Sequence, residues 1–461
     1  MARALPLGGP VQATLQRRIW RWHFLAGLMV IPFAIVLAGS GALYLFKPQI
    51  EGWAEARVQA GLGEAPPGAS SLPMDKLLAI AQNRHPEAPL AKLTLPRSPT
   101  DRSVEFDLRT ALGPMTLWVD RYTGAILHST RSDRRILAIA QDLHGSLLAG
   151  ETGSWIVELM ACWMIVLLLS GLYLWWPRGQ AWWRIFLPQF SGLRQRREWW
   201  RRLHGAVGAW AAAFILLLLL SGLPWTSVWG AGFDWVQKRM GWDGPGQEWF
   251  VTLQSHKPTT PSDGLNLWSR GAGDEGEVQL ESTIPTTTAE PLPLQAIVDR
   301  VLPQNLASPV EIRPPRGDNG VWTVRSMTQN RPLRQTVHYD RWSGEEIMRI
   351  RFPDYHPVQQ TVSYGIALHE GALFGWLNQL LGLLTALAVV LLSISGCIVW
   401  WKRRPAGGLG LPPMPSDPRL GKGFRLLILG LAAFLPLMAL SLLICLVCDW
   451  LWQCGLRLRT R

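Results

Sequence analysis

Residues 21–41 read RWHFLAGLMVIPFAIVLAGSG, and residues 202–222 read RLHGAVGAWAAAFILLLLLSG. In both segments an arginine stands two positions before a histidine, a glycine follows four positions after that histidine, and a Ser-Gly pair begins 17 positions after it. About 20 consecutive apolar residues are enough for a helix to cross a bilayer. The two segments therefore predict one transmembrane unit that occurs twice in the chain.

A second pair of segments repeats with its own spacing. His144 precedes a Ser-Gly pair at residues 170–171 by 26 positions, and the segment ends in Trp-Trp. His369 precedes a Ser-Gly pair at residues 395–396 by the same number, and this segment also ends in Trp-Trp. The two copies are offset by a constant 225 positions, which indicates that the whole chain is built from two similar halves.

The composition is typical of a membrane protein. Charged residues make up 17% of the chain, against about 25% in an average soluble domain. Hydrophobic residues make up 48%, which excludes an intrinsically disordered chain, and the 26 tryptophans suit a membrane–water interface. Five stretches are long and apolar enough to span a bilayer: Trp22–Phe46, Trp155–Trp176, Leu203–Val228, Trp376–Trp401 and Phe424–Trp450.

Basic residues cluster beside these apolar stretches. The net charge is +12, and residues 1–21, 178–202 and 402–425 each hold a basic cluster next to an apolar run. The positive-inside rule places these clusters in the cytoplasm and the polar regions 47–140 and 230–358 outside, which disfavours nucleic acid as a partner. Both halves then start in the cytoplasm, so the repeats are parallel and related by an axis along the membrane normal.

This topology predicts the fold class and the order of domains. We expect an α-helical membrane protein with a pseudo-two-fold four-helix transmembrane bundle, a fifth C-terminal helix and two α+β modules outside the cytoplasm. The expected segments are a cytoplasmic N-terminus 1–21, helix one 22–46, outer module one 47–140, an interfacial segment with helix two 141–176, a cytoplasmic loop 177–202, helix three 203–229, outer module two 230–358, an interfacial segment with helix four 359–401, a cytoplasmic loop 402–423, helix five 424–452 and a tail 453–461. Helix five sends the tail outward, although Arg457, Arg459 and Arg461 in it favour the cytoplasm.

The two outer regions share a pattern of one helix followed by strands. The first has a helix at Met74–Arg84 and strand-like runs that end in a turn at Gly124, and the second has a helix at Leu294–Val301 and strands that end in a turn at Gly344. Turn glycines between alternating strands are hairpin signals. Residues 245–290 are rich in Gly, Pro, Ser and Thr and are expected to be an insertion in the second module.

Four of the nine histidines occupy equivalent positions in the repeat. The pseudo-two-fold axis pairs His23 with His204 at the cytoplasmic end of the bundle, and His144 with His369 at the outer end. Two imidazoles that face each other across a helix bundle are the arrangement that a six-coordinate haem iron needs. The sequence therefore predicts two bis-histidine haem sites.

Glycines and arginines beside the inner pair fit the same interpretation. Gly27 and Gly208 lie one helical turn from their histidines and are expected to leave room for a porphyrin, although small residues also serve ordinary helix packing. Arg21 and Arg202 are expected to pair with haem propionates, or to enforce topology.

Other interpretations of the histidines stay open at this stage. A bare metal site is one, but only Glu370 accompanies either pair at ligand spacing, and zinc prefers a fuller ligand set. A purely structural role is another. The Ser-Gly pairs are expected to serve helix packing.

Taken together, the Trp-His…Gly…Ser-Gly helix, the Leu-His…Gly…Ser-Gly…Trp-Trp helix and the Asp-Arg-x-x-Gly hairpin resemble the PepSY-associated transmembrane family of bacterial inner-membrane proteins. The resemblance extends to about Arg404 and leaves out helix five and the 245–290 insertion. It implies PepSY-like folds for residues 72–130 and 290–350, which would lie in the periplasm. It also implies two b-type haems held by the four histidines, and the reduction of ferric siderophores for iron release.

The preferred function is therefore a transmembrane electron conduit of the iron-regulated or siderophore-reductase type. The chain has no G-x-G-x-x-G after a strand, so it needs a separate donor, either a cytoplasmic partner or quinol. One alternative is a non-enzymatic PepSY membrane protein that binds or regulates a periplasmic partner. Another is a siderophore or metal transporter, which is less favoured because few polar residues lie within the helices.

Overall fold

The computed structural model describes residues 10–63, 69–98, 100–187, 196–242, 255, 290–405, 407–408, 410 and 422–459. The chain forms two compact units. The first comprises Met1–Ile50, Ile136–Asp243 and Pro357–Arg461, and the second comprises Glu51–Arg135 and Gly244–His356. The first is called the helical unit and the second the sheet unit.

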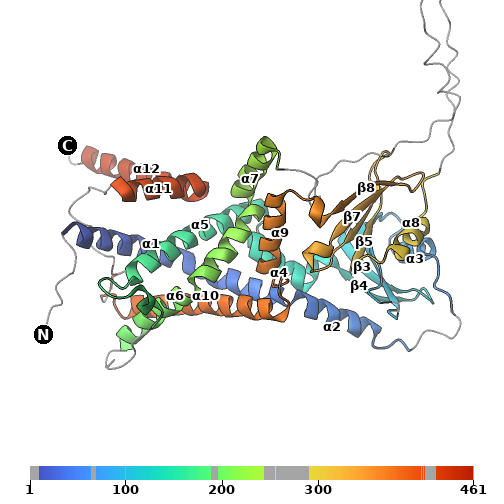
Figure 1. The fold of residues 1–461 in the computed structure, drawn as a ribbon, viewed down its shortest axis with the longest axis horizontal. Helices are drawn as coiled ribbons and strands as arrows, with labels where there is room; N and C mark the ends of the chain where they lie inside the picture. Colours follow the sequence, from blue (N-terminus) through green and yellow to red (C-terminus); the bar gives the residue numbers. More distant parts are fainter. Residues whose placement is uncertain are drawn as a thin grey trace, which may run out of the picture. The chain divides into compact units, whose positions relative to one another are not determined.

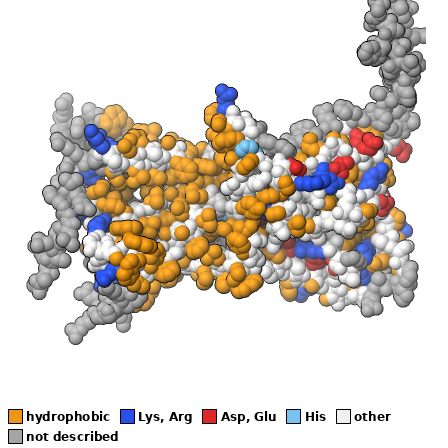
Figure 2. All heavy atoms as spheres, viewed as in Figure 1, with side chains coloured by type: hydrophobic (Ala, Val, Ile, Leu, Met, Phe, Trp, Pro, Cys, Tyr) orange, Lys and Arg blue, Asp and Glu red, His pale blue; other side chains and the backbone are white. Residues whose placement is uncertain are grey.

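Four helices of the helical unit are long and apolar enough to cross a membrane. They are α1 (Pro10–Leu45), α5 (Gly150–Trp175), α6 (Arg196–Gly222) and α10 (Trp376–Trp401), and they run side by side (Figure 1). Their outward faces carry exposed large hydrophobic side chains, and the visible face of the unit is almost entirely hydrophobic (Figure 2). This matches the expected first four spans.

The packing order of the four helices places α1 and α6 at opposite corners. Helix α1 packs against α5 and α10, and α6 packs against the same two helices. Two shorter helices, α4 (Ile136–Ser146) and α9 (Pro357–His369), precede α5 and α10. Helix α4 packs against α1, and α9 packs against α6, so the two halves repeat each other's contacts.

The predicted fifth helix is broken in two. Helix α11 (Lys422–Phe434) and α12 (Pro436–Arg459) are bent by 117° at the break. Pro436 has no N–H to continue the helical hydrogen bonding, and Leu435 at the bend is fully buried. The indole of Trp229, in α7 (Ser227–Met240), donates to the Phe434 carbonyl at 3.0 Å, and Trp163 in α5 donates to the Ser441 hydroxyl at 3.2 Å. These donors satisfy polar groups at and near the break, as apolar surroundings require.

The sheet unit is one continuous antiparallel sheet of eight strands rather than two separate modules. Its order is β4-β3-β2-β1-β5-β6-β7-β8. The strands are β1 (Leu90–Thr94), β2 (Ser103–Thr110), β3 (Gly113–Asp120), β4 (Ile126–Arg131), β5 (Val310–Arg313), β6 (Trp322–Ser326), β7 (Gln335–Tyr339) and β8 (Glu346–Arg351). The first strands of the two modules pair with each other, with Leu93 opposite Ile312. Both residues are fully buried, so the hydrophobic core runs across the seam.

The helices of the two modules also cap each other. In α8 (Leu294–Val301) the backbone N–H groups of Leu294 and Gln295 donate to the Asp75 carboxylate at 2.9 and 3.0 Å. In return, the Gln295 side chain accepts from the N–H of Met74, the first residue of α3 (Met74–Gln82). Each helix thus satisfies free N–H groups at the start of the other.

Charge stabilises the same seam. The Lys92 ammonium lies 2.9 Å from Glu311 and 3.2 Å from Asp107. Burial alone lowers the pKa of Lys92, but the two carboxylates raise it above the ordinary value.

The predicted turn glycines, Gly124 and Gly344, have φ of 74° and 67°, a conformation that side chains disfavour. Helix α2 (Lys47–Gln59) completes the described helices.

The bend between α11 and α12 predicts that both ends of this pair lie on one side of the membrane. Helix α11 has 13 residues, about 20 Å at 1.5 Å per residue, which is too short for a hydrocarbon core of about 30 Å. Dual reporter fusions after Arg404 and after Arg461 are therefore expected to report the same side, and a fusion after Arg135 the opposite side. Opposite results for the first two fusions would show a bent but complete span.

Candidate functional site

The inner histidine pair lies across the bundle between its opposite corners. His23 belongs to α1 and His204 to α6. Their ring centroids are 6.4 Å apart, and the ring planes are nearly perpendicular at 88°. The two side chains are separated by 181 positions in the chain, and the repeat symmetry alone predicted that they meet.

The outer pair comes from the two short helices. His144 lies near the end of α4, and His369 is the last residue of α9. Their ring centroids are 6.1 Å apart with planes at 80°. The structure therefore brings together both predicted pairs, with nearly the same separation and the same crossed orientation of the rings.

This separation suits one metal atom between two rings. Metal–nitrogen bonds to histidine are about 2 Å long, and each ring centre lies roughly 1 Å behind its nitrogen, so two axial imidazoles stand about 6 Å apart. Among the residues that the structure describes, no group of three or more His, Cys, Asp or Glu is placed to hold a metal ion. Two-histidine sites fit a metal whose other ligands come from a macrocycle.

Nδ1 of each of the four paired histidines contacts a neighbouring helix, which leaves Nε2 outside these contacts. In the inner pair, Nδ1 of His23 lies 2.9 Å from the Ser170 hydroxyl, and Nδ1 of His204 lies 2.9 Å from the Ser395 hydroxyl. Each serine belongs to the helix packed beside its histidine, α5 for the first and α10 for the second.

The outer pair has the same arrangement. Nδ1 of His369 lies 3.0 Å from the Ser221 hydroxyl in α6. Nδ1 of His144 lies 3.3 Å from the Ser40 hydroxyl in α1 and 2.9 Å from the Leu37 carbonyl. All four serines belong to the Ser-Gly pairs of the repeat. The Ser-Gly pairs were expected to serve helix packing, and the serines in addition contact the histidines of neighbouring helices.

A longer motif now becomes visible in the sequence. A leucine stands three positions before each of these serines, so that every histidine faces a Leu-x-x-Ser-Gly segment of a neighbouring helix. We call these four segments the histidine sockets; they are residues 37–41, 167–171, 218–222 and 392–396. The glycine of each socket lies against the imidazole that the socket holds. The fourfold recurrence of the motif was the signal that sequence reasoning missed.

The glycines and arginines predicted beside the inner pair are placed as follows. A Cβ on Gly27 would lie 3.8 Å from Leu167, and a Cβ on Gly208 would lie 3.6 Å from Leu392. These are ordinary contacts, so protein packing alone does not require glycine there, and a role in leaving room for a macrocycle stays a prediction. Arg202 donates to Glu198 at 3.2 Å, and Arg21 also has interactions within the protein, so neither role expected of these arginines is decided.

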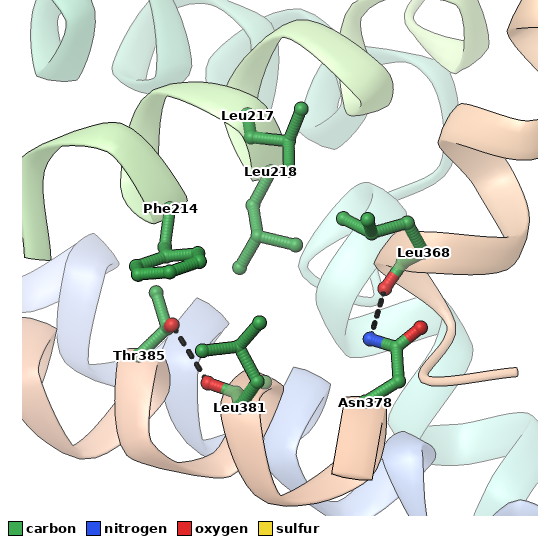
Figure 3. A pocket seen from close by; sticks show the side chains of 8 residues that line it. Phe214, Leu217, Leu218, Leu368, Asn378, Leu381 and Thr385 are labelled. Carbon is green, nitrogen blue, oxygen red and sulfur yellow. Dashed lines mark hydrogen bonds between the residues drawn. The ribbon is translucent and has the colours of Figure 1, made fainter. Parts of the chain in front are cut away.

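A small pocket lies beside the outer pair, between α6, α9 and α10 (Figure 3). Asn378 of α10 points into it and donates to the carbonyl of Leu368, the residue before His369, at 2.9 Å. Its side-chain oxygen accepts from the Leu373 N–H at 3.1 Å. Asn378 is almost fully buried, and position 153 in the other half is glycine, so this support for a histidine exists in the second half only.

The two pairs are held at different levels of the bundle. On α1, His23 and Ser40 are 17 residues apart, and Ser40 marks the level of the outer pair. At 1.5 Å per residue this is about 25 Å, most of a hydrocarbon core of about 30 Å. One pair therefore lies toward each end of the spans.

The comparison with protein families agrees with this architecture. The model of the PepSY-associated TM region matches residues 20–403. The chain belongs to this family. The match includes all four histidines and all four histidine sockets, and it ends before α11, as the resemblance in the sequence predicted. No curated protein matches this PepSY-associated chain.

Asn378→Ala is expected to loosen the end of α9 and with it the backbone that carries His369. Loss of a buried hydrogen-bonding side chain costs about 1–3 kcal/mol. Hydrogen exchange measured by mass spectrometry should become faster in residues 366–374, while α4 in the other half should be unchanged. Thr385→Val is the matched control, because Thr385 only bonds back to Leu381 of its own helix. Equal exchange in both variants would show that Asn378 does not anchor this turn.

Proposed function

We propose that the protein is a di-haem b-type electron-transfer protein of the bacterial inner membrane. The observation that carries the proposal is the presence of two crossed imidazole pairs, 6.4 and 6.1 Å apart, toward the two ends of one bundle. Haem would be held at each pair by the two histidines, and it would supply reversible one-electron chemistry. The protein's own residues orient the cofactor and tune it.

The residues of the bundle perform three tasks in this proposal. The four histidines would each hold the haem iron through Nε2. The sockets hold the other nitrogen and so fix the ring orientation. The apolar helices around each pair keep water away, which lowers the local dielectric and affects the potential.

The direction of transfer rests on charge and on the family. The basic clusters lie at the end of the bundle that holds His23 and His204, so this end is assigned to the cytoplasm, and the sheet unit to the periplasm. Electrons then enter at the inner pair from a cytoplasmic partner or quinol, because the sequence carries no dinucleotide-binding fingerprint. They leave at the outer pair.

The proposed acceptor is a ferric siderophore in the periplasm, as the family resemblance implies. Siderophores hold iron through hard oxygen ligands, which suit Fe(III) better than Fe(II). One-electron reduction weakens this chelation, so iron is released from the chelator. The reaction is balanced by one electron for each ferric ion reduced.

Loss of either outer ligand is expected to remove one of the two haems. His144→Ala and His369→Ala should lower the haem content to about half and abolish the reduction of periplasmic acceptors, because the outer haem needs both imidazoles. Pyridine haemochrome assay and reduced-minus-oxidised spectra measure the haem. His85→Ala, in the sheet unit, is the control. Wild-type haem content in either outer variant would contradict the ligand assignment.

Loss of an inner ligand should separate chemical from physiological reduction. In His23→Ala or His204→Ala the outer haem is expected to remain reducible by dithionite but not by the native donor in membrane vesicles, because the electron path begins at the inner pair. Stopped-flow spectra at the b-type α band measure both rates. Normal turnover with the native donor would remove the inner pair from the path.

The rival function is a non-enzymatic PepSY membrane protein that binds or regulates a periplasmic partner, with structural histidines. Protein purified from haem-replete cells distinguishes the two. Soret and α bands that sharpen on dithionite reduction favour the conduit, and colourless protein favours the rival.

A further inference from the structure

We propose that the four histidine sockets are positioning sites that fix which nitrogen of each histidine faces the haem iron and adjust the reduction potential of each haem separately. The inference rests on the proposed function. It concerns the serines and glycines of residues 37–41, 167–171, 218–222 and 392–396, which touch the histidines and not the iron.

The donors and acceptors of hydrogen bonds in each socket determine which nitrogen of the imidazole carries the proton. A serine hydroxyl has one proton, and Ser170, Ser221 and Ser395 each donate it to the carbonyl three residues before, at 3.1 Å. Such a serine has only lone pairs to offer the histidine. Nδ1 must therefore be the protonated nitrogen, and the lone pair of Nε2 is left for a metal.

The fourth socket reaches the same result by a second contact. Ser40 donates to the Val36 carbonyl at 2.8 Å, and Nδ1 of His144 also lies 2.9 Å from the Leu37 carbonyl, which accepts only. This ring is held by a carbonyl as well as by a serine. Replacement of Ser40 therefore leaves His144 with a good acceptor.

The hydrogen bond at Nδ1 also changes the ligand strength. A histidine that donates its second N–H to an acceptor is a more basic ligand, which favours the ferric state, and such outer partners typically change metal affinity by 10- to 100-fold. Loss of the serine is expected to weaken this preference by up to about tenfold, or about 59 mV for one electron. The affected haem becomes easier to reduce.

The glycines place the rings, and here the two halves differ. A Cβ on Gly41 would lie 2.9 Å from Cε1 of His144, and a Cβ on Gly171 would lie 3.1 Å from Cε1 of His23. In the second half, the corresponding distances are 3.4 Å for Gly222 and 3.5 Å for Gly396. The sockets formed by first-half residues are thus the tighter ones, and each haem is predicted to have one tightly and one loosely seated ligand.

This difference supplies a matched experiment at each haem. Gly41→Ala is compared with Gly222→Ala for the outer haem, and Gly171→Ala with Gly396→Ala for the inner haem, all in full-length purified protein. The tight variants are expected to displace the imidazole and to shift the low-spin EPR g-values and the potential of one haem. The loose variants should shift them less. Because alanine is the better helix former, none of the four is expected to unfold its helix.

The serine variants test the tautomer. Ser170→Ala and Ser395→Ala should raise the inner potential, and Ser221→Ala the outer one, in redox titrations followed at the α band. Ser40→Ala should shift the outer potential least, because the 2.9 Å contact between Nδ1 of His144 and the Leu37 carbonyl remains. The leucine carbonyls of the other sockets also interact with their histidines, which is expected to limit the shift in every serine variant. Ser393→Ala is the control, since Ser393 bonds only to the Val389 carbonyl of its own helix.

The outcomes separate this inference from the function on which it rests. Wild-type protein without haem would end the proposed function. Wild-type protein with two haems, combined with tight and loose glycine variants that behave alike or serine variants with unchanged potentials, would overturn the socket inference alone. Shifts confined to the haem whose socket was changed would support it.

Discussion

The hydrogen bond from Nδ1 of each histidine to a neighbouring helix is the constraint on which the rest of the bundle depends. An imidazole inside an apolar bundle has two polar nitrogens, and each costs free energy if it is left unsatisfied. The sockets satisfy one nitrogen and thereby decide which one remains. The ring centroids of each pair lie 6.4 and 6.1 Å apart, a separation at which one bound metal would satisfy the remaining nitrogen of both rings. Without the sockets, the rings would have no fixed orientation and the pairs no defined geometry.

The repeat explains why the pairs join the halves while the sockets do not. His23 is held by Ser170 and His144 by Ser40, so the sockets connect helices of the same half. The ring pairs, in contrast, always take one histidine from each half. One half alone therefore contains two oriented histidines but no pair. Two copies related by a two-fold axis are the smallest arrangement that places two histidines at each level.

The sequence predicted the pairs correctly because the spacing from histidine to Ser-Gly is the same in both copies of each repeated segment. Equal offsets on both sides of a two-fold axis place equivalent residues opposite each other, whatever the details of packing. The role of Ser170 and its equivalents was not predictable in the same way. A Ser-Gly pair in an apolar helix is equally typical of close helix packing, and spacing along one helix does not show which neighbour its side chains contact.

Two features of the fold could not be predicted from the sequence, for similar reasons. The pairing of β1 with β5 joins strands that are more than 200 residues apart, and each strand alone has the same alternating pattern whether or not its edge is covered. The break at Pro436 lies inside a run that hydropathy treats as continuous. Pro436 permits a break, but a proline can also lie in a kinked single span, and the contacts of Trp229 and Trp163 that accompany the bend are tertiary.

The two halves share their ligands but not the support around them. Asn378 anchors the turn behind His369, while the equivalent position behind His144 is a glycine. Gly41 and Gly171 lie closer to their imidazoles than Gly222 and Gly396 do. The two-fold axis runs along the membrane normal, so it relates the two halves and leaves the inner and outer levels distinct even in a symmetric bundle. Because each pair takes one histidine from each half, the glycine differences make the two histidines of one pair unequal, whereas Asn378 supports the outer pair alone.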